Sequence, residues 1–96
     1  MKMYKPPHPG EFIKEVYLDE LSIAERTVAQ KLKVSPSTLN RIIKGKSSIS
    51  PEMALKLSIT LGRSAESWLL MQDRYSLWVA SKELNLDDVE KLQVSA

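Results

Sequence analysis

The sequence contains no cysteine, so neither a disulfide framework nor a thiolate metal site can be built from its residues. Its single histidine, His8, has no partner residues in a metal-ligand spacing, and its three glycines form no phosphate-binding loop. We interpret His8 as a local turn residue. With no site for chemistry in the sequence, we expect a protein that is not an enzyme and that binds no metal, cofactor or small-molecule substrate.

Long apolar segments are missing as well. No run of residues approaches the length of a membrane span, and the N-terminal residues contain no apolar signal core. We therefore expect a cytoplasmic protein without a membrane partner. The 96 residues, 43% of them hydrophobic and only three of them glycine, predict one helix-rich domain that can bury a core of its own.

Acidic residues are missing from one segment in particular. Residues 26–46 contain six basic side chains and no acid. Residues 1–25 hold three bases against five acids, and residues 47–96 hold five against seven, so both flanks are slightly acidic. A basic segment of this kind is typical of a nucleic-acid-binding face. A solvated helical surface explains the charge equally well, and charge alone does not separate the two.

Helix-start residues followed by an apolar period predict five helices. The starts lie at His8-Pro9-Gly10-Glu11, Ser22–Glu25, Ser35-Pro36, Ser50-Pro51-Glu52 and Ser64. At the second start we expect a capping box, in which the Ser22 hydroxyl and the Glu25 carboxylate satisfy backbone amides reciprocally. Gly45 and Gly62 are placed to end the third and fourth helices, Gly45 in a left-handed conformation.

The five helices are expected to form one domain over residues 9–84. Residues 1–8 are expected to be a flexible lead-in, and residues 85–96 a partly ordered tail. The apolar face of the first helix is predicted to hold Phe12, Ile13, Val16 and Tyr17. The core stripe of the fourth is predicted to hold Met53, Ala54, Leu57 and Leu61, broadened by Leu55 and Ile59.

The fifth helix is apolar on more than one side and therefore needs more than one partner surface. Trp68 is expected in the core of its own chain. Leu70, Leu77 and Trp78 are expected in a two-fold interface, because one small domain has no remaining surface that could bury them.

The second and third predicted helices, joined at Lys33-Val34-Ser35, have the arrangement of a helix-turn-helix, whose second helix enters the major groove. The outward positions of that helix hold Ser37, Thr38, Asn40, Arg41 and Lys44, with no carboxylate among them. Arg41 is suited to guanine O6 and N7, and Asn40 to adenine N6 and N7. Ser35, Thr38, Lys44 and Lys46 are better placed for phosphates, which fix register rather than sequence.

Residues 9–79 resemble the Xre/Cro-type helix-turn-helix family and, within it, the short HigA (VapI-like) antitoxins. The resemblance spans about three-quarters of the chain. Its most specific elements are the His-Pro-Gly-Glu start and the later Trp-Leu-x-x-Gln segment. The matching segments are His8-Pro9-Gly10-Glu11, Val34-Ser35-Pro36-Ser37-Thr38, Gly45-Lys46, Met53-Ala54-Leu55-Lys56-Leu57, Trp68-Leu69-Leu70-Met71-Gln72 and Tyr75-Ser76-Leu77.

The resemblance implies an all-α, five-helix, lambda-repressor-like domain whose fifth helix is extended for dimerisation. It implies a homodimer that binds a palindromic operator in double-stranded DNA, represses its own operon and neutralises a RelE-like toxin that cuts translating mRNA. The implied base-reading residues are Pro36, Ser37, Asn40 and Arg41, and the implied phosphate contacts include Ser35, Lys44 and Lys46. A stand-alone Xre-type repressor without a toxin, and an interaction module that does not bind DNA, are the alternatives.

Two positions depart from the family pattern. Glu25 stands where Gln is frequent, and its carboxylate faces phosphate unfavourably unless its own hydrogen bonds turn it away. Lys33 stands where Gly is frequent, and a non-glycine residue in the left-handed conformation costs roughly 1 kcal/mol. Lys33 is expected to gain a phosphate contact in return.

Overall fold

The computed structural model describes residues 4–94, and these residues form helices and no strand. The expected all-α, five-helix fold is confirmed. The first helix begins as α1 and continues without a break as a π-helical segment, η1. The elements are α1 (Pro9–Phe12), η1 (Ile13–Asp19), α2 (Glu25–Leu32), α3 (Pro36–Ile43), α4 (Pro51–Thr60) and α5 (Ala65–Glu83).

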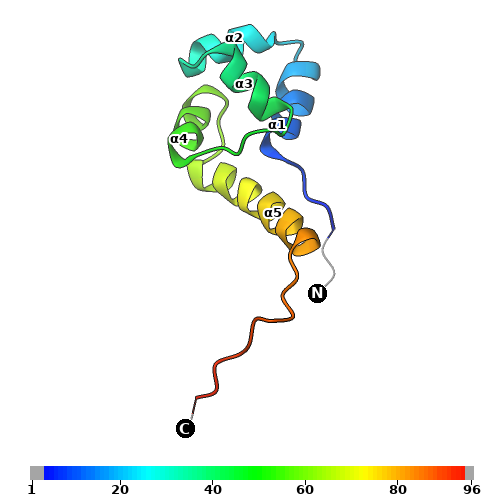
Figure 1. Cartoon of the computed structure of the whole chain (residues 1–96). Helices are drawn as coiled ribbons and strands as arrows, with labels where there is room; N and C mark the ends of the chain where they lie inside the picture. Colours follow the sequence, from blue (N-terminus) through cyan, green and yellow to red (C-terminus); the bar gives the residue numbers. More distant parts are fainter. Residues whose placement is uncertain (1–3, 95–96) are drawn as a thin grey trace.

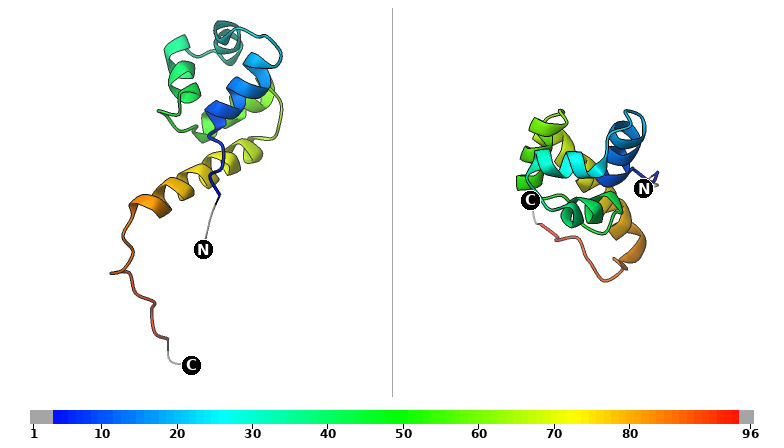
Figure 2. Two further views of the ribbon diagram at one scale, coloured as in Figure 1. Left: turned by 90° about the vertical axis from the view of Figure 1, so that its right-hand side faces the viewer. Right: turned by 90° about the horizontal axis from the view of Figure 1, so that it is seen from above.

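The first four helices pack together on one side of α5, which runs beneath them (Figures 1 and 2). Helices α2 and α3 lie at the end of the molecule far from the C-terminal residues (Figure 1). Trp68, on α5, is fully buried as expected, and its indole Nε1 donates to the Gly62 carbonyl over 2.8 Å. The buried core comprises Ile13, Val28, Ala29, Leu32, Leu39, Ile42, Ile49, Met53, Ala54, Leu57 and Trp68.

The predicted starts of α3, α4 and α5 are confirmed. Ser35, Ser50 and Ser64 each take an extended conformation and accept the backbone N–H of the residue three positions later. This hydrogen bond satisfies an amide that the first turn of a helix leaves free. Gly45 has the expected left-handed conformation, with a φ of 74°.

The capping box predicted at Ser22 is wrong. Helix α2 begins at Glu25, its N-cap is Ala24, and no side chain caps it. Ser22 has a φ of 54°, in the left-handed region, where it ends the preceding helix. An N-cap residue needs an extended backbone, so the conformation that turns the chain out of η1 removes Ser22 from the capping role.

Gly10 allows α1 to approach α3 closely. A Cβ atom at this position would lie 1.8 Å from the Ile42 carbonyl oxygen, so no larger residue fits without moving the backbone. Beyond Phe12 the helix widens into η1, which the sequence did not predict. Val16, expected on the inner face, is exposed because the wider turns rotate it towards solvent.

The broad apolar stripe predicted for α4 is also wrong in part. Met53, Ala54 and Leu57 are buried as expected, but Leu55 is exposed and Ile59 is 87% exposed. Helix α4 packs against α5 and α2 through one face only, and positions 55 and 59 point away from that face. Within residues 4–94, no helix is long and apolar enough to cross a membrane.

The chain on either side of the helical body is extended. Residues 4–8 run alongside α5, and residues 84–94 are exposed and lead away from the helices (Figures 1 and 2). Residues 1–3 of the expected lead-in and residues 95–96 of the expected tail lie outside the described residues.

Candidate nucleic-acid interface

The turn between α2 and α3 fixes how the two helices present their outer faces. Lys33 has φ 60° and ψ 41°, the left-handed conformation expected at this position. The Val34 amide donates to the Ala29 carbonyl over 3.1 Å, which closes the end of α2. Leu32 and Leu39 turn inward and are fully buried, so the opposite face of α3 is turned to solvent.

The outer face of α3 and the loop after it carry the side chains that the sequence assigned to DNA. Arg41 lies in the last turn of α3, and neither it nor any other basic residue of 26–46 forms an ion pair within residues 4–94. Thr38 and Asn40 are half-buried. The exposed members of the set are Lys33, Ser35, Pro36, Ser37, Arg41, Lys44 and Lys46.

Three hydroxyl groups gather at the N-terminal end of α3. The Ser35 Oγ accepts the Thr38 amide over 3.2 Å and lies 2.8 Å from the Thr38 Oγ1. It also lies 3.2 Å from the Ser37 Oγ. The cap therefore organises this polar patch, and the positive end of the helix dipole lies beneath it.

The unusual Glu25 does not contact its own helix cap. Its Oε2 accepts a hydrogen bond from the Asn40 Nδ2 over 3.0 Å, across the joint between α2 and α3. The bond ties down the amide of Asn40 and uses one of its two N–H groups. The remaining N–H and the Oδ1 are not used in it, and these are the two groups that a bidentate contact with adenine needs.

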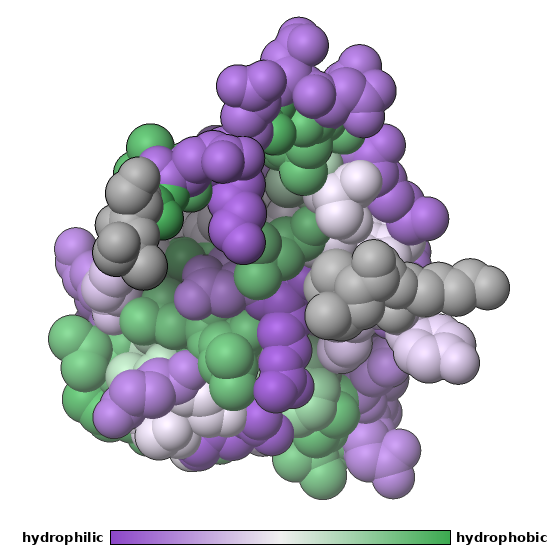
Figure 3. Space-filling view, turned by 90° about the horizontal axis from the view of Figure 1, so that it is seen from below, coloured by the Kyte–Doolittle hydropathy of each residue, from purple (hydrophilic) through white to green (hydrophobic). Residues whose placement is uncertain are grey.

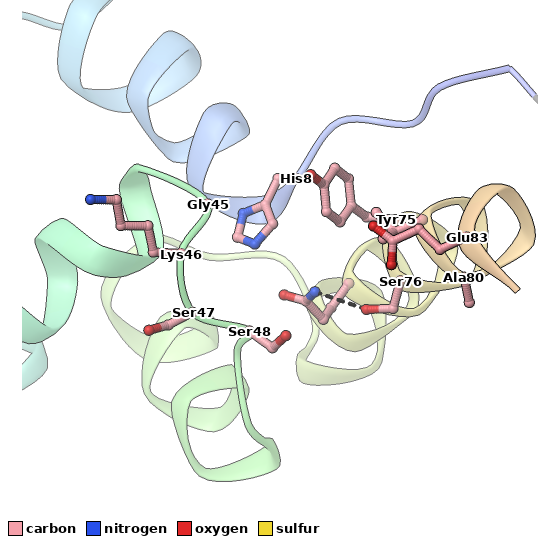
Figure 4. Close-up of a pocket in the computed structure, with 11 residues that line it drawn as sticks. His8, Gly45, Lys46, Ser47, Ser48, Tyr75, Ser76, Ala80 and Glu83 are labelled. Carbon is pink, nitrogen blue, oxygen red and sulfur yellow. Dashed lines mark hydrogen bonds between the residues drawn. The ribbon is translucent and has the colours of Figure 1, made fainter.

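The loop after α3 is held by residues distant in sequence. The Lys46 amide donates to the Arg41 carbonyl over 2.9 Å. At the far end of the loop the Ile49 amide donates to the Oε1 of Gln72, which is buried on α5. The Gln72 Nε2 in turn donates to the Ser76 Oγ, the bond that is dashed in Figure 4. Gln72 thus positions the loop that carries Lys44 and Lys46.

His8 supports the same loop from the other side. Its Nδ1 accepts the Gly10 amide over 2.9 Å and so caps α1, and its ring meets Tyr75 edge-on at a centroid distance of 4.9 Å. Figure 4 shows the His8 ring directed towards the loop, with the Lys46 side chain pointing away from the cavity of about 270 Å³ between them. Burial lowers the pKa of His8, against the opposing effects of the Ser47 backbone and Glu11.

Sequence reasoning missed these positioning roles. His8 was interpreted as a turn residue, which its capping bond agrees with, but its contact with Tyr75 joins segments 67 positions apart. Gln72 belonged to the quoted Trp-Leu-x-x-Gln segment without a role. A buried amide in an otherwise apolar stripe was the available sign, because such a group requires hydrogen-bond partners.

The residues expected at a two-fold interface lie along the outer side of α5. Leu70 and Leu77, seven positions apart on one stripe, are 50% and 62% exposed. Trp78 is half-buried by its own chain, with the Lys5 and Lys82 ammonium groups 5.7 and 5.0 Å from its ring centroid. Leu70 and Leu77 therefore expose the larger apolar surface of the three.

The fold and this surface define a DNA-binding helix-turn-helix protein. The helix-turn-helix family model matches residues 13–68. The chain belongs to the Xre-type helix-turn-helix family, and within it the chain is similar to the HigA and GraA antitoxins.

Three relatives illustrate the similarity. The HTH-type transcriptional regulator YddM of Escherichia coli (strain K12) is 40% identical over 92 residues, which cover 96% of this chain and 97% of that protein. The structure of antitoxin GraA in complex with its operator is 30% identical, with a TM-score of 0.87 and 98% of both chains covered. The structure of Pseudomonas aeruginosa antitoxin HigA with the higBA promoter is 34% identical, with a TM-score of 0.79, covering 92% of this chain and 99% of that chain.

Proposed function

We propose that the protein is a sequence-specific DNA-binding antitoxin that represses its own operon and neutralises a RelE-like, mRNA-cleaving toxin. One observation carries the DNA-binding part of this proposal. The solvent-facing side of α3 and its following loop presents Arg41, Lys44 and Lys46 without an ion-pair partner within residues 4–94. Unpaired Lys and Arg side chains favour DNA binding because they neutralise phosphates and release the counterions condensed there. GraA and HigA, the similar antitoxins, were solved with an operator and a promoter.

The contacts divide between base edges and phosphates. Arg41 is proposed as the principal base-reading residue, because its exposed guanidinium is free to fork onto a guanine. Pro36, Ser37 and Asn40 are proposed to face the same groove, with Asn40 oriented by Glu25. The proposed phosphate contacts are Lys33, Ser35, Thr38, Lys44 and Lys46.

We propose that the protein binds as a homodimer. Leu70 and Leu77 give α5 an exposed apolar stripe that a second copy can bury, and Trp78 lies beside them. Two recognition helices about 34 Å apart then meet successive major grooves of a palindrome. Leu77→Asp is expected to give a monomer in analytical ultracentrifugation. A dimer that survives this change would place the interface elsewhere.

The DNA-binding proposal is tested at Arg41. Arg41→Ala is expected to cost about 1–3 kcal/mol on the operator in a gel-shift titration, and to relax specificity at one base step. Arg41→Lys is the matched control: it keeps the positive charge and loses the planar fork. The lysine variant should therefore retain affinity for random DNA while losing operator preference. Unchanged operator affinity in both variants would remove Arg41 from the interface.

The toxin-binding part is tested separately. The adjacent open reading frame, if it encodes a small RelE-like protein, is co-expressed with this chain, and copurification and growth rescue are measured. A stand-alone repressor is the second candidate, favoured by the similarity to the transcriptional regulator YddM over nearly the whole of both chains. Operator binding without growth rescue by this chain would support the repressor over the antitoxin.

A further inference from the structure

A shallow groove with two arginines lies at the N-terminal half of α5. It has a volume of about 220 Å³, and most of its lining is apolar. It continues the stripe of α5 that carries Leu70 and Leu77, so groove and stripe form one surface. The lining side chains that matter here are Phe12, Arg63, Ser67, Leu70, Met71 and Arg74.

Two arginines line the groove, and neither has an acidic partner among the described residues. The Arg63 guanidinium lies over the Phe12 ring, 4.9 Å from its centroid, and donates to the Ser67 Oγ over 2.7 Å. Arg74 is exposed on α5. Neither arginine forms an ion pair within residues 4–94. The groove therefore suits a ligand that is both apolar and negatively charged.

The C-terminal segment of residues 84–94 has that chemistry. Its five large apolar side chains are all at least 59% exposed; they are Leu84, Leu86, Val89, Leu92 and Val94. Asp87, Asp88 and Glu90 outnumber the single Lys91, and none of these four forms an ion pair within residues 4–94. The space-filling view from below shows apolar side chains interleaved with polar ones on this side of the molecule (Figure 3).

The segment also carries the start pattern of a helix. Asn85 accepts the Asp87 amide through its Oδ1 over 2.9 Å, and the Val89 amide donates to the Leu86 carbonyl over 3.0 Å, which makes one turn. If that turn is continued, Leu86, Val89 and Leu92 share one face of a short helix. Asp87 lies on the opposite face, and Asp88 and Glu90 lie along the two edges of the apolar face. A helix of this length is marginal in water alone and needs a surface to pack against.

We propose that residues 84–94 of one copy occupy the groove of a second copy. The proposal rests on the dimer proposed above. A two-fold axis across α5 at the midpoint of Leu70 and Leu77, which lets each stripe cover the other, pairs the two α5 helices antiparallel. That midpoint falls between residues 73 and 74, so residue 84 of one copy lies opposite residue 63 of the other. The segment of one chain thus starts beside Arg63 of the second, at one end of the groove. The groove extends from there towards Arg74, so the segment occupies it by turning back along α5 of the second copy at its turn of residues 86–89. This path brings its acids within reach of Arg63 and Arg74.

The segment is directed away from the groove of its own chain. It continues past the end of α5, which gives the described chain its extents of 57 × 24 × 21 Å. It also lies at the end of the molecule remote from α2 and α3 (Figure 1). The lining residues of the groove do not belong to α2 or α3, so docking there leaves the proposed DNA-facing surface of both copies open.

Cysteine cross-linking tests the occupant directly, because the natural sequence contains no cysteine. Chains carrying Ser67→Cys and chains carrying Val89→Cys are mixed and oxidised. We expect a disulfide-linked dimer of the two variants, and none when Gln30→Cys, on the surface of α2, replaces Ser67→Cys. A double variant that cross-links only within a monomer would show that the segment folds onto its own α5, and the proposal would be wrong.

Charge reversal gives an independent measurement. Asp87→Arg with Asp88→Arg should weaken the dimer about tenfold, the sum of two lost surface ion pairs and the new repulsion. Adding Arg74→Asp should restore most of the loss. A dimer constant unchanged by the reversal, while Leu77→Asp still gives a monomer, would overturn the docking of the segment and leave the α5 dimer intact. A wild-type chain that sediments as a monomer would instead remove the dimer and this proposal together.

Discussion

Replacing Glu25 with glutamine tests whether the one acidic side chain of this helix-turn-helix opposes DNA binding. Glu25 is the only acid between Glu20 and Glu52. Glutamine has the same shape, and its Oε1 can accept the Asn40 N–H that the Glu25 Oε2 accepts over 3.0 Å. The substitution therefore removes a negative charge and keeps the geometry of the recognition surface.

Glu25→Gln is expected to change the stability of the free protein and its affinity for DNA in opposite directions. In the free protein, a hydrogen bond to a charged acceptor becomes one to a neutral acceptor, which lowers the free energy of unfolding by at most about 1 kcal/mol. Solvent screening at the half-buried Glu25 reduces that loss further. In the complex, a unit charge a few ångströms from phosphate in a water-like medium costs roughly 0.5–1 kcal/mol. We therefore expect Glu25→Gln to bind DNA about three- to fivefold more tightly while being slightly less stable.

Fluorescence anisotropy titrations at two salt concentrations measure the gain. The gain in affinity should be the same for operator and random DNA, because the repulsion that is removed acts on phosphates. It should shrink as the salt concentration rises, because salt screens that repulsion. Glu66→Gln, at the first turn of α5 and remote from α3, is the matched control and should leave affinity unchanged. If Glu25→Gln binds no more tightly at low salt, the carboxylate does not face the DNA backbone and the reasoning fails.

Glu25→Ala separates charge from orientation. It removes the same charge but also releases the Asn40 amide, so it should gain affinity for random DNA and lose part of its preference for the operator. When Asn40 is also replaced by alanine, Glu25→Ala and Glu25→Gln should have the same DNA affinity and the same operator preference. In that background there is no Asn40 amide for residue 25 to orient. A difference that persists in that background would show that Glu25 acts on specificity without Asn40.

Three further predictions follow from the loop and the first helix. Lys46→Ala should weaken binding to all DNA and reduce the salt slope of log K by about one unit in titrations at several salt concentrations; an unchanged slope would remove Lys46 from the phosphate contacts. Gly10→Ala should lower the free energy of unfolding by about 3 kcal/mol or more in urea, because its Cβ would lie 1.8 Å from the Ile42 carbonyl oxygen, and a near-neutral effect would contradict the close approach. Because burial lowers the pKa of His8, the neutral form is favoured by folding, so its contribution to stability is present above pH 6.5 and is lost as the pH falls through the lower folded-state value. His8→Asn keeps a capping acceptor but does not titrate, and thermal melts from pH 7.5 to 5 should show the wild type losing more stability than this variant.

The sequence predicted the elements whose physics is local. The side chains of Ser35, Ser50 and Ser64 cap helices by accepting a hydrogen bond from the amide three residues later. Both partners lie within four consecutive residues, so the local sequence is enough to predict the bond. Gly45 and Lys33 take left-handed conformations at ends of helices, and these positions too follow from neighbouring residues. The basic, carboxylate-free face of α3 follows from residue order once α3 is known to be a helix.

Contacts between segments far apart in the chain could not be predicted from the sequence. Ser22 and Glu25 have the spacing of a capping box, yet the exit from η1 put Ser22 in a left-handed conformation, and Glu25 found Asn40 instead. Leu55 and Ile59 have the hydropathy of core residues, and only the choice of one packing face on α4 left them exposed.

The sequence by itself determined the five-helix framework, the helix-turn-helix and its charge, because caps, apolar periods and charge runs act over a few residues. The tertiary structure decided how the polar groups that we propose to contact DNA are held. It tied Asn40 to Glu25, braced the loop of Lys44 and Lys46 with Gln72, and brought α1 against α3 at Gly10. These contacts join residues 15 to 32 positions apart, and they exist only after the hydrophobic core has brought the helices together.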